Sequence, residues 1–119
     1  MQSERAARRI GNIATDATFS EFGEYKQRMM EVIQRQWHLL ARSSQLRPED
    51  SPSRVHVRFI LTSEGTVRSA DVINTTAGAV ATIITVDAVE SRSPFGKWTE
   101  EMVTIYGHET EVNIQFIYW

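Results

Sequence analysis

Three histidines are the side chains in this chain best suited to acid–base chemistry or metal binding. His38, His56 and His108 fall on different expected elements, and only His56 and His108 could approach each other, across neighbouring strands. A metal site or a catalytic base needs further ligands, or a carboxylate that orients the imidazole. The sequence places no such group beside them. We therefore interpret them as histidines of strand surfaces and of a helix end.

The other side chains with catalytic potential are isolated. Ser93 lacks the strand-to-helix setting of a nucleophile elbow. Asp71 and Asp87 have no partner carboxylate with which to divide acid and base roles, and the scattered glycines form no phosphate-binding loop. The chain has no cysteine, which excludes disulfides, thiolate nucleophiles and cysteine-based zinc sites. The sequence thus predicts a protein that is not an enzyme and that holds neither a metal nor a cofactor.

Length and charge place the chain among ordinary globular domains. It has 119 residues, of which 41% are hydrophobic and 24% charged, with a net charge of −2. That charge argues against a broad basic surface for nucleic acid. The longest uncharged run, residues 74–86, is shorter and more polar than a membrane span, which needs about 20 apolar residues. We expect one domain over residues 18–119, preceded by a flexible linker over residues 1–17.

An alternating segment in the middle of the chain predicts a β-hairpin. Its first strand has apolar residues at every second position, which is typical of a strand with one buried face. These residues are Val55, Val57, Phe59 and Leu61. Ser63-Glu64-Gly65 then supplies a tight turn that a left-handed glycine can close. The return strand spaces its apolar residues three and then two apart, so we expect a β-bulge near Ser69.

Helical patterns precede and follow this hairpin. Large apolar residues recur three or four apart from Phe22 to Leu40, which predicts a helix of about six turns. Residues 79–90 combine helical spacing with many β-branched residues, so periodicity alone leaves helix and strand open there. Alternating apolar residues from Val112 to Tyr118 predict a final strand.

With a helix over residues 79–90, the elements follow the order αββαβ, which makes the fold class α+β. A right-handed crossover places the last strand beside the first strand of the hairpin, on the side away from the second. We therefore expect a three-stranded antiparallel sheet of order 2-1-3, with two helices packed on one face. The last strand is then an edge, and it exposes a row of main-chain N–H and C=O groups.

Six short motifs occur in a fixed order between residues 22 and 118. They are Arg35-Gln36-Trp37, the strand Val55-His56-Val57-Arg58-Phe59, the turn Ser63-Glu64-Gly65, Asn74-Thr75-Thr76-Ala77-Gly78, Ser93-Pro94-Phe95, and the strand from Val112 to Tyr118. In this order they resemble the C-terminal domain shared by the TonB and TolA energy-transducing proteins. The chain departs from that family at Gly96-Lys97-Trp98, where further prolines are common, and in its Thr- and Ile-rich second helix. The resemblance favours a helix for residues 79–90.

The resemblance also implies a function. It implies a periplasmic, non-enzymatic binding domain of a TonB-like energy transducer, tethered to the inner membrane and its motor proteins by an upstream segment that this chain lacks. Its last strand would capture an extended segment of an outer-membrane transporter by strand addition. The binding residues would be Glu111, Val112, Asn113, Ile114, Gln115, Phe116 and Ile117. The alternative is a structural or dimerising cell-envelope domain, TolA-like, in which this strand is an ordinary edge or a homodimer contact.

Overall fold

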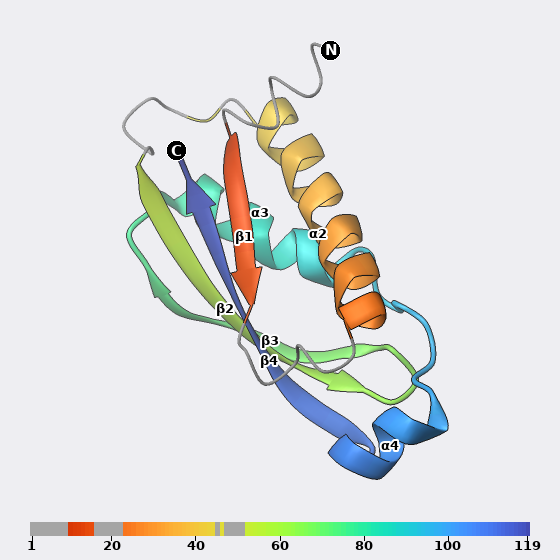
Figure 1. Ribbon diagram of the computed structural model, residues 1–119. Coiled ribbons are helices and arrows are strands. Elements are labelled where there is room, and N and C mark those ends of the chain that lie inside the picture. The colour runs from red at the N-terminus through yellow and green to blue at the C-terminus, as the bar shows by residue number, and fades with distance from the viewer. Residues whose placement is uncertain (1–9, 16–22, 45, 47–51) are drawn as a thin grey trace.

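The protein is described by a computed structural model that covers residues 10–15, 23–44, 46 and 52–119. Within these residues, four strands form one antiparallel sheet in the order β1-β4-β2-β3, accompanied by three helices (Figure 1). The elements are β1 (Gly11–Thr15), α2 (Gly23–Ser43), β2 (Ser53–Thr62), β3 (Val67–Thr75), α3 (Ala79–Glu90), α4 (Glu100–Tyr106) and β4 (Glu109–Tyr118). The predicted α+β class is confirmed, as is the helix over residues 79–90.

The predicted three-stranded sheet is wrong. Gly11–Thr15, which the sequence analysis assigned to a flexible linker, forms β1 and pairs antiparallel with β4. As a result β4 is not an edge over Ile114–Tyr118, although it lies beside β2 as expected. The segment was missed because a five-residue strand with one half-buried apolar side chain, Ile13, has too little alternation to detect. The other positions of the predicted linker, apart from Ile10, and Phe22 at the start of the predicted helical pattern lie outside the described residues.

The hairpin of β2 and β3 has the expected turn. Gly65 adopts a φ of 84°, and a Cβ atom there would lie 2.2 Å from the carbonyl oxygen of Gly96. Glycine is therefore required both by the backbone conformation and by the close approach of the later loop. Main-chain hydrogen bonds hold this loop on the turn: Phe95 N–H donates to the Gly65 carbonyl at 2.8 Å, and Trp98 N–H to the Ser63 carbonyl at 2.9 Å.

The predicted bulge near Ser69 is confirmed. The register between β2 and β3 shifts between Arg58 and Ile60, and Ser69 has a φ of 57°, in the left-handed region. A second shift, which the sequence analysis did not predict, lies between His56 and Val57 and leaves Ile73 as the extra residue. Each bulge interrupts the ladder and bends the strand.

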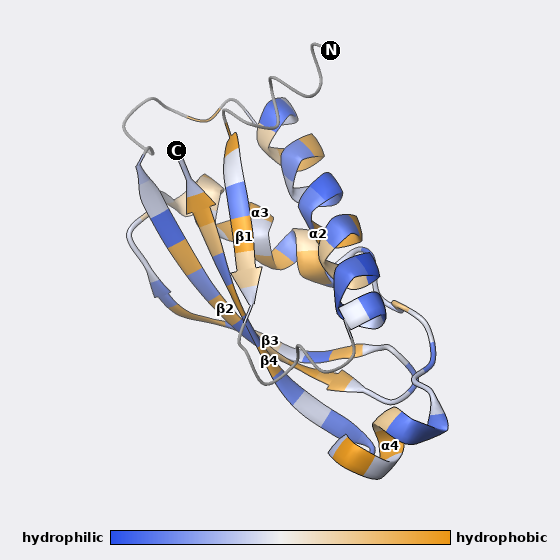
Figure 2. Cartoon of the chain, in the orientation of Figure 1, coloured by the Kyte–Doolittle hydropathy of each residue, from blue (hydrophilic) through white to orange (hydrophobic). Residues whose placement is uncertain are grey.

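The core lies between one face of the sheet and the helices α2 and α3. Hydrophobic and hydrophilic residues alternate along β2 and β4 (Figure 2), and the apolar ones are buried. The fully buried set from the sheet is Val55, Val57, Phe59, Leu61, Val112, Ile114, Phe116 and Tyr118, and that from α2 includes Met29, Ile33 and Trp37. Two helices on one face were predicted, and both contribute buried residues to this cluster.

A polar chain inside the core ties three elements together. The indole of Trp37 in α2 donates to the Tyr118 hydroxyl at 2.9 Å, and that hydroxyl donates to the Ala81 carbonyl of α3 at 2.6 Å. The Trp37 ring also lies edge-on to Phe116 and Tyr118, with centroids 5.1 and 5.0 Å away. Since each of these buried polar groups has a partner, the C-terminal end of β4 is fixed against both helices.

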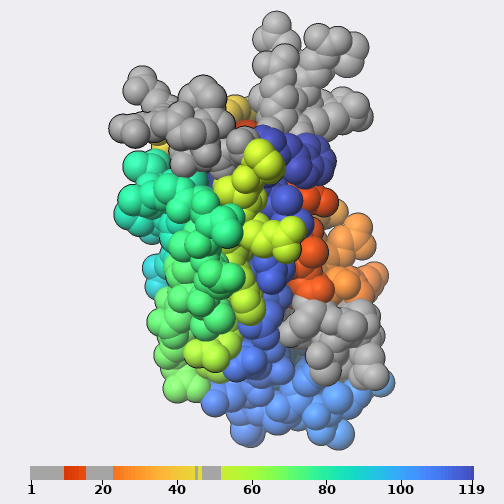
Figure 3. Space-filling model, turned by 90° about the vertical axis from the view of Figure 1, so that its left-hand side faces the viewer, coloured from red at the N-terminus to blue at the C-terminus, as the bar shows by residue number. Residues whose placement is uncertain are grey.

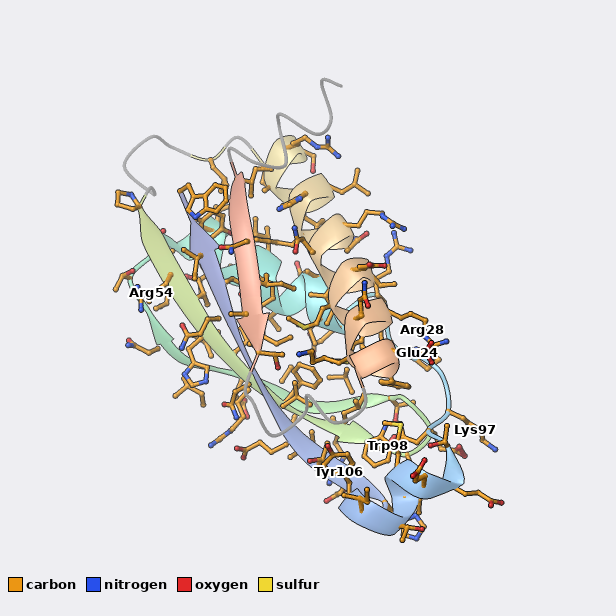
Figure 4. The ribbon with its side chains drawn as sticks, viewed as in Figure 1. Glu24, Arg28, Arg54, Lys97, Trp98 and Tyr106 are labelled. Atoms are coloured by element: carbon orange, nitrogen blue, oxygen red, sulfur yellow. The ribbon has the colours of Figure 1, made fainter. Side chains whose placement is uncertain are left out.

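The helix α4 closes the other end of the sheet. The Thr99 hydroxyl caps it by accepting from the Met102 N–H at 3.2 Å. Trp98, which is buried, packs edge-on against Tyr106 with ring centroids 5.9 Å apart, and Figure 4 shows the pair beside α4. Within the described part of the chain, none of the helices is long and apolar enough to cross a membrane.

Candidate peptide-binding edge

The structure keeps the three histidines apart. His38 is buried near the end of α2, His56 lies on the helix-free face of the sheet opposite Gln115, and His108 is exposed before β4. The main chain of His108 contacts Ser63, at the far end of β2 from His56. Among the described residues no three His, Asp or Glu side chains gather in a way that could hold a metal ion.

The seven residues expected to bind a peptide divide between the two faces of β4. Val112, Ile114 and Phe116 are buried in the core, while Glu111, Asn113, Gln115 and Ile117 face away from the helices. The side chains at these buried positions are thus not available to a ligand. Recognition at this strand would depend on backbone groups and on the outward side chains.

β1 occupies part of this edge. It pairs with β4 from Gly11 opposite Tyr118 to Thr15 opposite Ile114, which covers four of the expected binding residues, Ile114–Ile117. Figure 3 shows β1 (red) beside β4 (blue). No strand in the described ranges pairs on this side with Glu109–Asn113. The expected site is therefore covered in one half and has no described strand partner in the other.

The direction of the main-chain groups follows from two hydrogen bonds. Trp119 N–H donates to the Ile10 carbonyl at 3.1 Å, and the Thr15 hydroxyl donates to the Asn113 carbonyl at 3.1 Å. Successive residues of a strand direct their N–H and C=O groups to opposite sides. Odd-numbered residues of β4 therefore face the β1 side. Glu109 and Glu111 direct their main-chain donors and acceptors there, beyond the end of β1.

Gly11 brings β1 unusually close to β4. Its φ is 138°, and a Cβ atom at this position would lie 1.7 Å from the carbonyl oxygen of Ile117. No other residue fits without moving one of the strands. Two residues later, Ile13 points inward and is half-buried against the core, while Asn12 and Ala14 are exposed. Gly11 and Ile13 thus hold β1 against β4 and the core.

His38 connects β1 to α2. Its Nε2 lies 3.2 Å from the Gly11 carbonyl oxygen, and since a carbonyl only accepts, this nitrogen carries the proton. Burial lowers the pKa of His38, because the charged imidazolium loses its hydration; the nearby Arg42 acts in the same direction, while the hydrogen bond to Gly11 partly opposes them. At the opposite end of α2, burial raises the pKa of Tyr25, whose hydroxyl donates to the Gly96 carbonyl at 2.7 Å.

Polar side chains on the helix-free face flank the half of β4 that β1 leaves uncovered. His56 Nε2 lies 2.8 Å from Asn113 Oδ1, and the Asn113 amide donates to Glu111 at 3.2 Å. Arg58 lies 3.9 Å from the same Glu111 carboxylate, and Arg68 pairs with Glu109. These contacts, within β4 and to side chains of β2 and β3, orient the outward side chains of β4.

A groove separates α2 from β1. It has a volume of about 800 Å³ and is lined by Ile13 and Thr15 of β1 and by Met30, Gln34 and further α2 residues. Lys26, Glu31 and Arg35 line it as well, so its wall carries both signs of charge. β1 is accordingly bound along β4 but leaves space on its α2 side.

Four residues of this edge were not predicted from the sequence: Gly11, Ile13, Thr15 and Glu109. The available signal was weak: residues 10–15 form an uncharged run between Arg9 and Asp16, in a terminal region that is otherwise rich in charge. A strand that binds mainly through its backbone leaves little mark on side-chain pattern. Comparison of the chain with models of known families, with curated proteins and with solved structures finds no match.

Proposed function

We propose that this protein is a non-enzymatic binding domain that captures an extended peptide by strand addition at the β4 edge. In line with the sequence resemblance, the captured segment belongs to an outer-membrane transporter, and the domain acts in the periplasm as part of a TonB-like energy transducer. Motor proteins of the inner membrane, reached through a membrane anchor upstream of this domain, would then be its second set of partners.

One observation carries this proposal: the β4 edge already holds an antiparallel strand, β1, that comes from elsewhere in the chain. The edge is therefore geometrically competent for strand addition. It continues past Thr15 through Glu111 and Glu109, whose main-chain groups face the same side. Strand addition gains its affinity from such groups and its specificity from alternating side chains.

The alternative is a structural or dimerising domain of the cell envelope. The exposed apolar residues of α3 and β3 favour it: Val80 and Ile83 are 51% and 58% exposed, and Ile73 is 45% exposed. Contact between copies through this surface would shield them from water. The two proposals predict different surfaces and can be separated by one titration.

The test is an NMR titration of the isotope-labelled protein with capped peptides that carry the extended segments of outer-membrane transporters. Strand addition should perturb the amides of Glu109–Ile117 and leave the outer face of α2, around Glu24 and Arg28, unchanged. Perturbation of Val67–Thr75 instead would assign the site to β3. No response at millimolar peptide, together with self-association, would favour the dimerising domain.

A proline variant identifies the backbone as the binding group. Glu111→Pro removes a main-chain donor on the side away from β2, so the ladder between β2 and β4 keeps its hydrogen bonds. Glu111→Ala removes the same carboxylate but keeps the N–H, and serves as the matched control. We expect peptide binding to be lost in the proline variant and kept in the alanine variant. Equal binding by both would contradict strand addition at Glu111.

A further inference from the structure

We propose that β1 is a resident substitute for the ligand, so that the captured peptide displaces β1 and takes its register on β4. This inference rests on the proposed strand capture and specifies the chemistry of the ligand. The ligand is an antiparallel segment with glycine at the Gly11 position and an apolar residue at the Ile13 position. β1 thereby also limits access to the edge.

The glycine requirement follows from the approach of the two strands. Opposite Tyr118, a Cβ atom would lie 1.7 Å from the Ile117 carbonyl oxygen, which is main chain and cannot rotate away. The Gly11 carbonyl also accepts from His38 Nε2 at 3.2 Å. A ligand that repeats this conformation keeps both contacts. A ligand with a side chain at this position must move away from β4.

The requirement for an apolar residue follows from the position of the Ile13 side chain. Its side chain is half-buried against the core and lines the groove of about 800 Å³ between β1 and α2. Thr15, on the same face, lines the groove as well, and so does Met30 of α2. A ligand with larger apolar side chains at these two positions would extend into the groove. Such a ligand would bury more apolar area than β1 does and would bind in preference to it.

β1 is built to be displaced. It has five residues, two of which are exposed, and its α2 side faces the groove rather than a packed interface. Besides the ladder with β4 and the contact between the Gly11 carbonyl and His38, β1 is attached by the Thr15 hydroxyl on the Asn113 carbonyl and by the Trp119 N–H on the Ile10 carbonyl. A ligand can make the same main-chain bonds. Exchange of one strand for another then leaves the sheet complete.

The experiment weakens β1 in the full chain and measures binding of a capped peptide with the sequence of residues 10–15. Ile13→Asp places a charge at the inward position and should release β1, whereas Asn12→Asp adds the same charge at an exposed position and is the matched control. While β1 occupies the edge, the apparent affinity for the peptide equals the intrinsic affinity multiplied by the fraction of molecules whose edge is free. We expect Ile13→Asp to bind the peptide at least about tenfold more tightly than the wild type, with Asn12→Asp unchanged.

Two further measurements make the outcome decisive. A peptide with valine in place of its glycine should not bind the Ile13→Asp variant; equal binding of both peptides would overturn the register. Ala14→Pro, which deletes a donor to β4, replaces Ile13→Asp if the latter does not fold.

Equal affinity of the wild type and a variant whose β1 amides have lost their contacts with β4 would overturn displacement. No binding to that released edge by this peptide or by transporter segments would instead contradict the proposed strand capture. Dissociation of wild-type dimers by the peptide would assign the edge to the β1 of a second copy.

Discussion

The two ends of the strand order differ in how they deal with unpaired backbone. At one end, β3 departs twice from regular pairing, at Ser69 and at Ile73, and presents the charged side chains of Arg68 and Asp71. At the other end, β4 pairs with β2 in one continuous register from Glu109 to Tyr118, and β1 covers part of its outer side. Bulges and charges are common protections of an edge, and a covering strand is another.

The difference indicates which edge can bind. A bulged edge cannot offer a regular ladder to a new strand, because the extra residues shift its donors and acceptors out of register. The main-chain donors and acceptors of β4 alternate regularly along the strand, and β1 pairs with part of them. A covering strand, unlike a bulge, could be exchanged without any change to the strand it covers. This is why we propose binding at β4 and regard β3 as the protected edge.

The largest effect should come from the core residues that hold β4 in place. Phe116 is fully buried and lies 5.1 Å from the Trp37 ring, so Phe116→Ala should lower the free energy of unfolding by about 3–5 kcal/mol. Ile117→Ala, on the outer face of the same strand, should cost about 1 kcal/mol or less. Urea unfolding of both variants measures the difference. Similar losses would mean that the edge partners, rather than the core, fix β4.

A smaller effect should follow from changing the seat of β1. Gly11→Ala forces a Cβ atom against the Ile117 carbonyl, so we expect a loss of about 1–3 kcal/mol, limited by the contribution of β1 to stability. Gly23→Ala is the control, since a Cβ atom there would meet nothing within 4 Å. Hydrogen exchange should locate the change at Asn12–Thr15 and at the facing part of β4. Unchanged protection there would contradict the close approach at Gly11.

Much of the fold could be predicted because it is encoded in side-chain pattern. The alternation in β2 and β4, the glycine of the turn and the uneven spacing that signals the bulge at Ser69 all reflect which side chains are buried. β1 could not be predicted, because its pairing uses the backbone and only Ile13 and Ile10 contact the core. The same cause limited the candidate site. The residues of β4 were identified from its alternation, but the strand β1 that pairs with them was not.

Acid should weaken the attachment of β1 through His38. Since burial lowers its pKa in the folded state, the unfolded chain binds the proton more readily. The contribution of neutral His38 to stability is therefore complete above its ordinary pKa of 6.5 and is lost as the pH falls below that value. We expect the free energy of unfolding to fall between pH 7 and pH 5. His38→Gln, which keeps an N–H donor, should flatten this dependence, whereas replacement of the exposed His108 by Gln should not. An equal slope in wild type and His38→Gln would exclude His38 as its source.

The smallest effect concerns the protected edge. Ser69 holds a φ of 57°, a conformation that costs a residue with a Cβ about 1–2 kcal/mol, whereas glycine adopts it freely but loses more chain entropy on folding. The two terms leave a net gain of up to about 1 kcal/mol for Ser69→Gly. Ala70→Gly, one residue along in the same strand and without a left-handed φ, should instead lose about 0.5–1 kcal/mol. Urea midpoints that shift in opposite directions in the two variants, with equal slopes of the unfolding free energy against urea concentration, would show that Ser69 supplies the bulge at a cost in stability. A loss in both variants would mean that the serine side chain itself stabilises the edge, and that the bulge at β3 depends on more than backbone conformation.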